Sequence, residues 1–233
     1  MYKIAQYRSS DLMSDLINRH HSILLLLSRF HIPLGFADKT IEQICHDHQV
    51  DTETFLAVIN LNYGNPDTLP YDMCQRVSVD ALIDYLKNSH RFYLDYRLPS
   101  IRHSLASSLD QEDPKISKLL MQVYDQYARE IAKHMNYEEE HVFTYVNDLL
   151  HDNAYDSEFH IANFSEKHTH VEEKLDELRD IIIRYYPTQC NNALNCALYD
   201  LFSCAEDLSL HNEVEDRLFV PAIELLEKSL RKL

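Results

Sequence analysis

The stretch His134-Met135-Asn136-Tyr137-Glu138-Glu139, followed by Val142-Phe143, is the part of this sequence that most strongly determines its fold. A second stretch, His211-Asn212-Glu213-Val214-Glu215-Asp216, repeats its order and is followed by Leu218-Phe219 and Pro221. A His and a Glu four residues apart lie on one face of an α-helix, about one turn apart. Imidazole suits iron, zinc or copper, and a carboxylate can bridge two ions. Two helices that each offer such a pair inward are how a four-helix bundle builds a two-metal site.

The spacing alone is a weak signal, because the chain contains a third His-x-x-x-Glu match, from His168 to Glu172. The first two matches stand out by their shared context, in which acidic and then apolar residues follow the Glu. The alternative interpretation is a solvated helix face that carries His and Glu by chance. Manganese and zinc are further candidates for the metal, since both also bind these side chains.

The composition favours an all-α protein. Two glycines and seven prolines leave little material for turns, and few turn residues favour long helices over many short strands. The formal net charge of −16 argues against nucleic acid or an anionic membrane as a partner, since phosphates would be repelled. The longest apolar run, Ile23–Leu27, is too short to span a bilayer.

The cysteines indicate a reducing compartment. Their number is odd and their spacing fits neither a zinc ribbon nor a redox pair; they are Cys45, Cys74, Cys190, Cys196 and Cys204. The opening residues Met1–Ser10 have no apolar core of the kind a signal peptide carries. We therefore expect a cytoplasmic protein whose cysteines mostly pack as small apolar groups.

Residues 1–70 are predicted to form a small N-terminal domain of three helices. Its first helix should end near Phe30, where Pro33 and Gly35 oppose continuation. Asp38 is expected to cap the second helix and Asp51 the third. A DNA-binding helix-turn-helix could have this pattern, but the acidic balance argues against it.

Residues 71–233 are predicted to form a four-helix bundle. The best linker candidate is Asn62–Leu69, which is rich in turn-forming residues. Four long stretches with helical periodicity follow, at about 78–107, 114–150, 163–186 and 191–230, and Pro99 is a candidate kink in the first. The short breaks between the first pair and the last pair favour an up-down-up-down arrangement.

Each of the four predicted helices carries a candidate metal ligand. The histidines are His90, His134, His168 and His211, one on each helix, and the second and fourth helices add Glu138 and Glu215. A single buried His is usually a hydrogen-bonded core residue, whereas four on antiparallel helices at comparable heights predict one shared site.

Several segments together resemble the iron–sulfur cluster repair di-iron proteins, whose bundle is hemerythrin-like. Ala132–Glu139 is similar to that family's His-Met-x-x-Glu-Glu segment, and Cys190–Pro221 is similar to its last helix. His90-Arg91-Phe92-Tyr93 with Leu98-Pro99 resembles its His-x-x-Tyr and Leu-Pro signature. Ile32–Cys45 resembles part of its small leading domain, so the resemblance covers almost the whole chain.

This resemblance implies a hemerythrin-like bundle that binds two irons. His90, His134, His168 and His211 would be ligands, with Glu138 and Glu215 bridging the irons. These ligands leave coordination positions for an oxo or hydroxo bridge, water, or a small ligand such as oxygen or nitric oxide. Hemerythrin-type oxygen carriers have a fifth histidine where this chain has Glu172, so either Glu172 points away or it supplies an oxygen ligand. His170 is the less favoured neighbour of His168.

The family's activity is repair of damaged iron–sulfur proteins under oxidative or nitrosative stress. Its leading domain has adjacent cysteines just before the Lys-Thr segment, where this chain has Leu34-Gly35-Phe36-Ala37. That difference supports an alternative, a di-iron sensor or binder of oxygen or nitric oxide without repair activity. A metal-free interaction module is the third interpretation. The sequence leaves open the iron acceptor, any enzymatic activity and the oligomeric state, a homodimer included.

Overall fold

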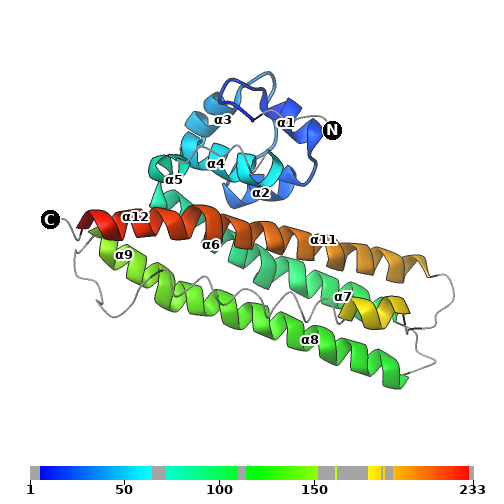
Figure 1. Ribbon diagram of the computed structural model, residues 1–233. Coiled ribbons are helices and arrows are strands. Elements are labelled where there is room, and N and C mark those ends of the chain that lie inside the picture. Colours follow the sequence, from blue (N-terminus) through cyan, green and yellow to red (C-terminus); the bar gives the residue numbers. More distant parts are fainter. Residues whose placement is uncertain are drawn as a thin grey trace. The chain divides into compact units, whose positions relative to one another are not determined.

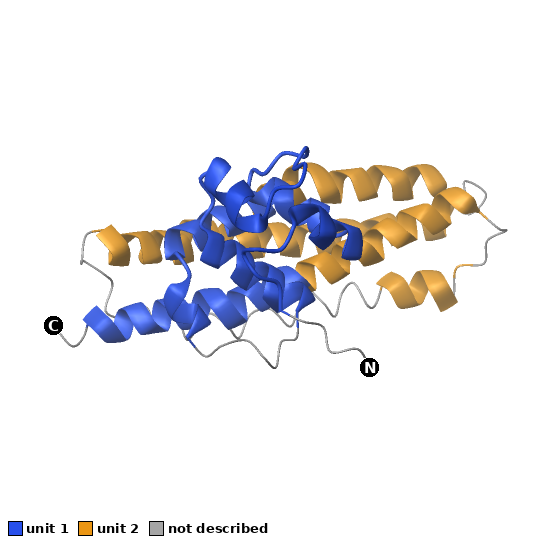
Figure 2. Cartoon of the chain, turned by 90° about the horizontal axis from the view of Figure 1, so that it is seen from above, with its two compact units in different colours: residues 1–89, 210–233 blue, residues 90–209 orange. Residues whose placement is uncertain are grey.

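The computed structural model describes residues 6–64, 72–109, 114–151, 161, 178–184, 186 and 191–230. The structure is all-α over these residues, apart from one isolated bridge between Leu12 and Thr40 (Figure 1). The chain divides into two compact units, residues 1–89 with 210–233 and residues 90–209 (Figure 2). The boundaries of these units fall within helices α6 (Val79–Arg91) and α11 (Asn192–Val214). The predicted division at residue 70 stays a prediction, and most of the predicted linker, residues 65–69, lies outside the described residues.

The first unit begins with four short helices, α1 (Met13–Arg19), α2 (Ile23–Arg29), α3 (Ile41–Asp47) and α4 (Thr52–Tyr63). The sequence predicted one helix up to Phe30, but the chain breaks between α1 and α2, where His20 adopts an extended conformation with φ −138° and ψ 92°. The predicted break after Phe30 is present, and Gly35 has a φ of +111°, in the region that favours glycine.

Two side-chain caps fix where α3 and α4 begin. Thr40, and not the predicted Asp38, caps α3 in a reciprocal capping box with Gln43. Asp51 caps α4 as predicted, and its carboxylate accepts a hydrogen bond from the Thr54 amide at 2.8 Å. Both caps satisfy backbone donors that the first helical turn would otherwise leave without partners.

The remaining helices of the first unit are α5 (Met73–Arg76), most of α6, the end of α11, the π-helical segment η6 (Glu215–Phe219) and α12 (Val220–Leu230). Phe30 joins the early helices to α6, because its ring packs on Phe55 and stacks on Tyr85 at 4.8 Å between centroids. Asn88 of α6 donates a hydrogen bond to the Arg29 carbonyl at 2.9 Å. These contacts hold the early helices and α6 together within this unit.

The second unit has one core that is shared by four helical stretches. They are η2 (Phe92–Arg97) with α7 (Leu98–Ser108), α8 (Pro114–Tyr137), the helical residues 178–184, and α11. α8 continues through η3 (Glu138–Val142) into α9 (Phe143–His151). Each stretch contributes buried apolar residues to the core, among them Leu105, Tyr124, Ile182 and Leu201. The predicted bundle helices are therefore present over the described residues.

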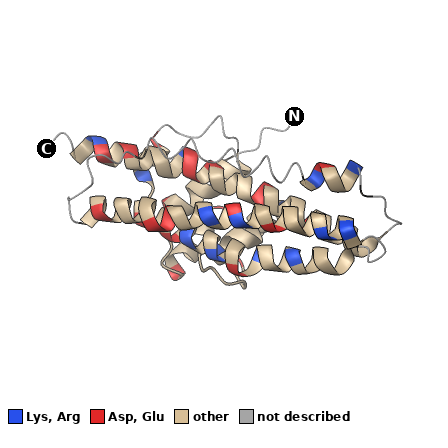
Figure 3. Ribbon diagram, turned by 90° about the horizontal axis from the view of Figure 1, so that it is seen from below, with Lys and Arg blue, Asp and Glu red and all other residues tan. Residues whose placement is uncertain are grey.

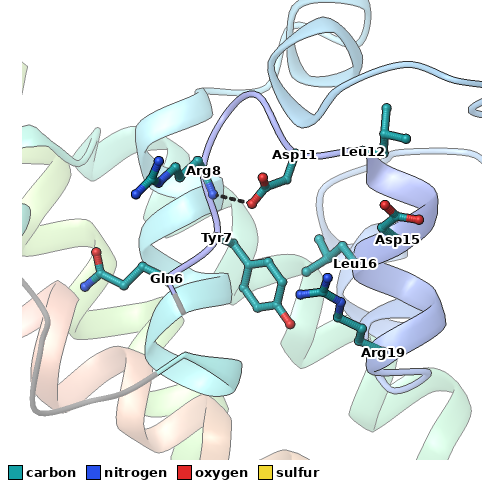
Figure 4. Close-up of a pocket in the computed structure, with 8 residues that line it drawn as sticks. All are labelled: Gln6, Tyr7, Arg8, Asp11, Leu12, Asp15, Leu16 and Arg19. Atoms are coloured by element: carbon teal, nitrogen blue, oxygen red, sulfur yellow. Dashed lines mark hydrogen bonds between the residues drawn. The ribbon is translucent and has the colours of Figure 1, made fainter. Parts of the chain in front are cut away.

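Polar contacts fasten the helices of the second unit to one another. The Tyr124 hydroxyl donates to the Leu98 carbonyl at 2.7 Å, and Asn191 donates to the Ser108 carbonyl at 2.9 Å. Arg102 makes two hydrogen bonds to Asp125 at 2.7 and 3.0 Å. Basic and acidic residues are interspersed along the helices (Figure 3).

Candidate metal site

His134 and Glu138 form a close pair at the junction of α8 and η3. The Nε2 atom of His134 lies 2.9 Å from the Oε1 atom of Glu138. Glu138 is fully buried, whereas the His134 side chain is 14% exposed. The helix presents this pair inward because its neighbours Met135 and Val142 are buried apolar residues on the same face.

His90, in the last turn of α6, faces the other oxygen of the same carboxylate. Its Nε2 atom lies 3.1 Å from the Oε2 atom of Glu138, and its side chain is buried. The ring stacks on Phe143, with 5.6 Å between centroids and 18° between planes. Each oxygen of Glu138 therefore faces a different imidazole, which is the arrangement that a carboxylate needs if it bridges two ions.

The second nitrogen of His90 indicates how its imidazole is oriented. Its Nδ1 atom lies 3.0 Å from the Oε1 atom of Glu139, whose side chain is 41% exposed. An ionised carboxylate can only accept a hydrogen bond, so Nδ1 donates to Glu139; if the ring is neutral, the lone pair is then on Nε2. Nε2 and the Glu138 oxygen are then two acceptors 3.1 Å apart, and a proton or a cation between them would relieve their repulsion. Metal-ligating histidines typically have this second hydrogen bond to a carboxylate.

The distances around Glu138 also fit a metal ion. Two ligand atoms with bonds of about 2.1 Å, set at right angles on an octahedral ion, lie about 3.0 Å apart. The two nitrogen–oxygen distances at Glu138 are 2.9 and 3.1 Å. His90 and His134 therefore each place a ring nitrogen at a ligand-like distance from Glu138, and His90 and Glu138 belong to a His/Glu group that could hold a metal ion.

The first unit contains a second pair of the same type. His211 of α11 and Glu215 of η6 are both buried, and the Nε2 atom of His211 lies 3.1 Å from the Oε1 atom of Glu215. Val214, Leu218 and Phe219 are buried around them and set this face of the helix inward. The two predicted His-x-x-x-Glu segments thus have the same local geometry.

Three π-helical segments accompany these residues, and the sequence did not predict them. η3 begins at Glu138, η6 begins at Glu215, and η2 begins two residues after His90. The amides that follow the segments, Phe143, Val220 and Leu98, donate to the carbonyls five residues back. Single π-helical turns inside α-helices are frequent at functional sites.

Two of the three segments have a visible cause in the sequence. Pro99 follows η2 and Pro221 follows η6, in each case one residue after the helix cap. A proline has no N–H, and its ring clashes with the carbonyl four residues back, so a widened turn relieves that clash. Pro99, predicted as a candidate kink, lies in the first turn of α7. η3 has no proline, and there the Thr144 hydroxyl donates to the Glu139 carbonyl at 3.3 Å.

The third predicted helix is only partly described. His168, the predicted ligand on it, and its neighbours His170 and Glu172 lie outside the described residues. The complete ligand set of four histidines and two glutamates therefore stays a prediction.

A family model described as the hemerythrin HHE cation-binding domain matches residues 81–223 of the chain. The matched range includes His90 and both His-x-x-x-Glu pairs, and it begins after the four short N-terminal helices. No curated protein matches the chain. Among the residues that the structure describes, none of the helices has the length and apolar character needed to cross a membrane.

Proposed function

We propose that this chain, which belongs to the hemerythrin HHE cation-binding family and has its all-α bundle fold, binds two iron ions. The proposed ligands are the six predicted residues His90, His134, His168, His211, Glu138 and Glu215. Four of them, His90, Glu138, His211 and Glu215, are buried and offer nitrogen and oxygen ligand atoms. The observation that carries the proposal is Glu138, whose two oxygens each face a different histidine.

Iron fits this mixture of donors. Imidazole and carboxylate together suit non-haem iron, whereas a thiolate-rich set would favour zinc or an iron–sulfur cluster. Four imidazoles and two bridging carboxylates leave positions open on two octahedral ions. An iron pair held in this way would supply a binding place for a small ligand and one-electron changes of oxidation state.

We further propose a role in iron–sulfur cluster repair under oxidative or nitrosative stress. The support is the combination of motifs around His90, His134 and His211, which resembles the repair proteins. Damaged iron–sulfur proteins would then be its partners, and iron from the bundle would be the repairing agent.

The proposed repair does not depend on cysteine thiols. The segment that holds adjacent cysteines in the repair family reads Leu34-Gly35-Phe36-Ala37 here. The remaining cysteine nearby, Cys45, is buried, and that burial raises the pKa of its thiol to about 11. A thiol with so high a pKa is a poor nucleophile at neutral pH, because the thiolate is the reactive form.

These cysteine differences favour one second candidate, a di-iron sensor or binder of oxygen or nitric oxide that performs no repair. Both candidates require the same metal centre. They differ in whether iron leaves the protein for an acceptor.

Metal content tests the shared part of the proposal. Protein purified without chelators from cells given ample iron should contain close to two irons per chain. Stoichiometric zinc with no iron would overturn the di-iron proposal.

A recovery assay separates repair from sensing. A nitric-oxide-damaged iron–sulfur enzyme would be incubated with the wild type, Cys45→Ser or His211→Ala. Recovery with the wild type and with Cys45→Ser, but not with His211→Ala, would support iron donation from the bundle. No recovery with an iron-loaded wild type that reversibly binds nitric oxide would contradict repair and favour the sensor.

A further inference from the structure

The thiol of Cys74 lies against the helix that carries Glu215. Its Sγ atom donates to the carbonyl oxygen of Arg217 at 3.3 Å. Cys74 is in the short helix α5, which packs against both η6 and α12 in the first unit. Arg217 is two residues beyond Glu215, within the same π-helical segment.

Pro221 changes the hydrogen bonding that is open to the Arg217 carbonyl. In an α-helix it would accept a hydrogen bond from the amide of residue 221, and that residue is Pro221, which has no N–H. Pro221 therefore removes the donor that an α-helix would offer to this carbonyl, so a donor from outside the helix gains importance. The Cys74 thiol supplies a donor from a neighbouring helix at the position where the proline removed one.

α4 contacts α5 and the segment that follows it. The amide of Ser78, two residues after α5 ends, donates to the Thr54 hydroxyl at 2.9 Å. Thr54 is buried, and its own amide is bound to Asp51 at the start of α4. The helix that carries Cys74 therefore has contacts outside the proposed metal site as well.

The Cys74 thiol is in the protonated form that a hydrogen-bond donor requires. Burial raises the pKa of Cys74 above its ordinary value, which keeps the sulfur protonated at neutral pH. A protonated thiol is a weak hydrogen-bond donor, whereas a thiolate would only accept. The contact with a carbonyl oxygen requires the protonated form.

We infer that Cys74 is a positioning residue for Glu215: its thiol completes the hydrogen bonding that Pro221 interrupts and so holds η6 in the π-helical form. The inference rests on the proposed role of Glu215 as a metal ligand. Glu215 begins the π-helical turn, and the Val220 amide closes that turn on its carbonyl. Without the thiol, the turn would open more often and the carboxylate would spend less time in its ligating position.

The test compares metal binding in three cysteine variants. Metal-free protein would be titrated with Co²⁺, whose visible absorption reports the coordination geometry. Cys74→Ala should weaken Co²⁺ binding by about tenfold, the lower end of the effect of groups that support metal ligands. Cys74→Ser keeps a donor and should recover most of the affinity. Cys196→Ala is the matched control, because Cys196 is an exposed cysteine on α11.

The substitution Pro221→Ala tests whether the Cys74 thiol acts by replacing the α-helical donor that the Arg217 carbonyl lacks at Pro221. Pro221→Ala restores an N–H four residues after Arg217, so the helix can supply its own donor. In that background, Cys74→Ala should change Co²⁺ affinity by less than about twofold. An equal loss in both backgrounds would overturn the inference, since Cys74 would then act by filling space.

Amide hydrogen exchange in the metal-free variants gives a readout that does not depend on the metal. Cys74→Ala should speed exchange over residues 215–220 several-fold relative to the wild type and Cys196→Ala, because the turn opens more often. Unchanged exchange would overturn the inference even if Co²⁺ affinity falls. A wild type that binds no Co²⁺ would contradict the proposed metal site, and the exchange data would still decide whether Cys74 holds η6.

Discussion

The Nδ1 atom of His90 lies 3.0 Å from the Oε1 atom of Glu139, so the ring nitrogen that does not face Glu138 is also bound to a carboxylate. This second contact fixes the rotation of the imidazole and directs Nε2 toward Glu138. Glu138 and Glu139 are adjacent in sequence, yet one is buried and the other is partly exposed. Neighbouring residues thus have different roles, one as a proposed ligand and the other as the support of a ligand from another helix.

We predict that Glu139→Ala weakens metal binding about tenfold, because supporting carboxylates typically contribute at least that much to affinity. Glu139→Gln should lose less, since its amide oxygen can still accept the hydrogen bond from Nδ1. The measurement is Co²⁺ titration of metal-free protein. Glu140→Gln is the control, because Glu140 is an exposed neighbour. If Glu139→Ala binds Co²⁺ as tightly as this control, Glu139 does not support the site.

Replacing His134 or His211 by Ala should remove a large part of the iron. Each histidine belongs to one of the two His-x-x-x-Glu pairs, so either change removes a ligand from the proposed centre. Iron per chain would be measured by elemental analysis after purification without chelators. His103→Ala serves as the control, since His103 is exposed on α7. Iron content equal to that of the control in both variants would exclude these residues as ligands.

Changing Glu138 or Glu215 to Gln should weaken magnetic coupling between the irons more than it disturbs the fold. A bridging carboxylate uses both oxygens, and the amide replaces one of them with a non-coordinating NH2 group. Mössbauer or EPR spectroscopy of the oxidised protein measures the coupling, with the partly exposed Glu213→Gln as the control. Antiferromagnetic coupling that is unchanged in both variants would remove these residues from the bridge.

The long helices could be predicted because their apolar residues recur at the helical period. The predicted stretch 114–150 corresponds to α8, η3 and α9, and 191–230 corresponds to α11, η6 and α12. The inward direction of Glu138 and Glu215 followed from the same periodicity, because buried neighbours determine which face turns inward. The break at His20 was missed, because Leu12 and Leu27 continue the apolar pattern on either side of it.

The π-helical segments could not be predicted from periodicity, because a pattern of 3.6 residues per turn assumes the hydrogen bonding of an α-helix. The local signal was the proline that follows each of η2 and η6, and the sequence interpretation used Pro99 only as a kink. Cys74 was also missed as a support for η6. Its partner Arg217 is far along the chain, and a contact with a backbone carbonyl leaves no trace in side-chain patterns.

The metal centre should require only the part of the chain that follows the four N-terminal helices. All six proposed ligands lie beyond residue 70, so a protein that begins at Asp72 should retain its iron. In this protein α5 loses its contacts with α4 and keeps those with η6 and α12. A protein that begins at Ser78 lacks α5 and with it the thiol that donates to Arg217, so it should retain less iron at similar helical content. Circular dichroism and iron analysis of both proteins provide the measurement.

The comparison of these two proteins has a built-in control, since they differ only in residues 72–77. Cys74→Ala in the longer protein should reproduce much of the loss seen in the shorter one, if the thiol and not the bulk of α5 is responsible. A longer protein that is soluble and helical but contains no iron would mean that the N-terminal helices supply a ligand. Equal iron in both proteins would instead mean that α5 has no part in holding Glu215, because the two chains carry identical residues from Ser78 onward.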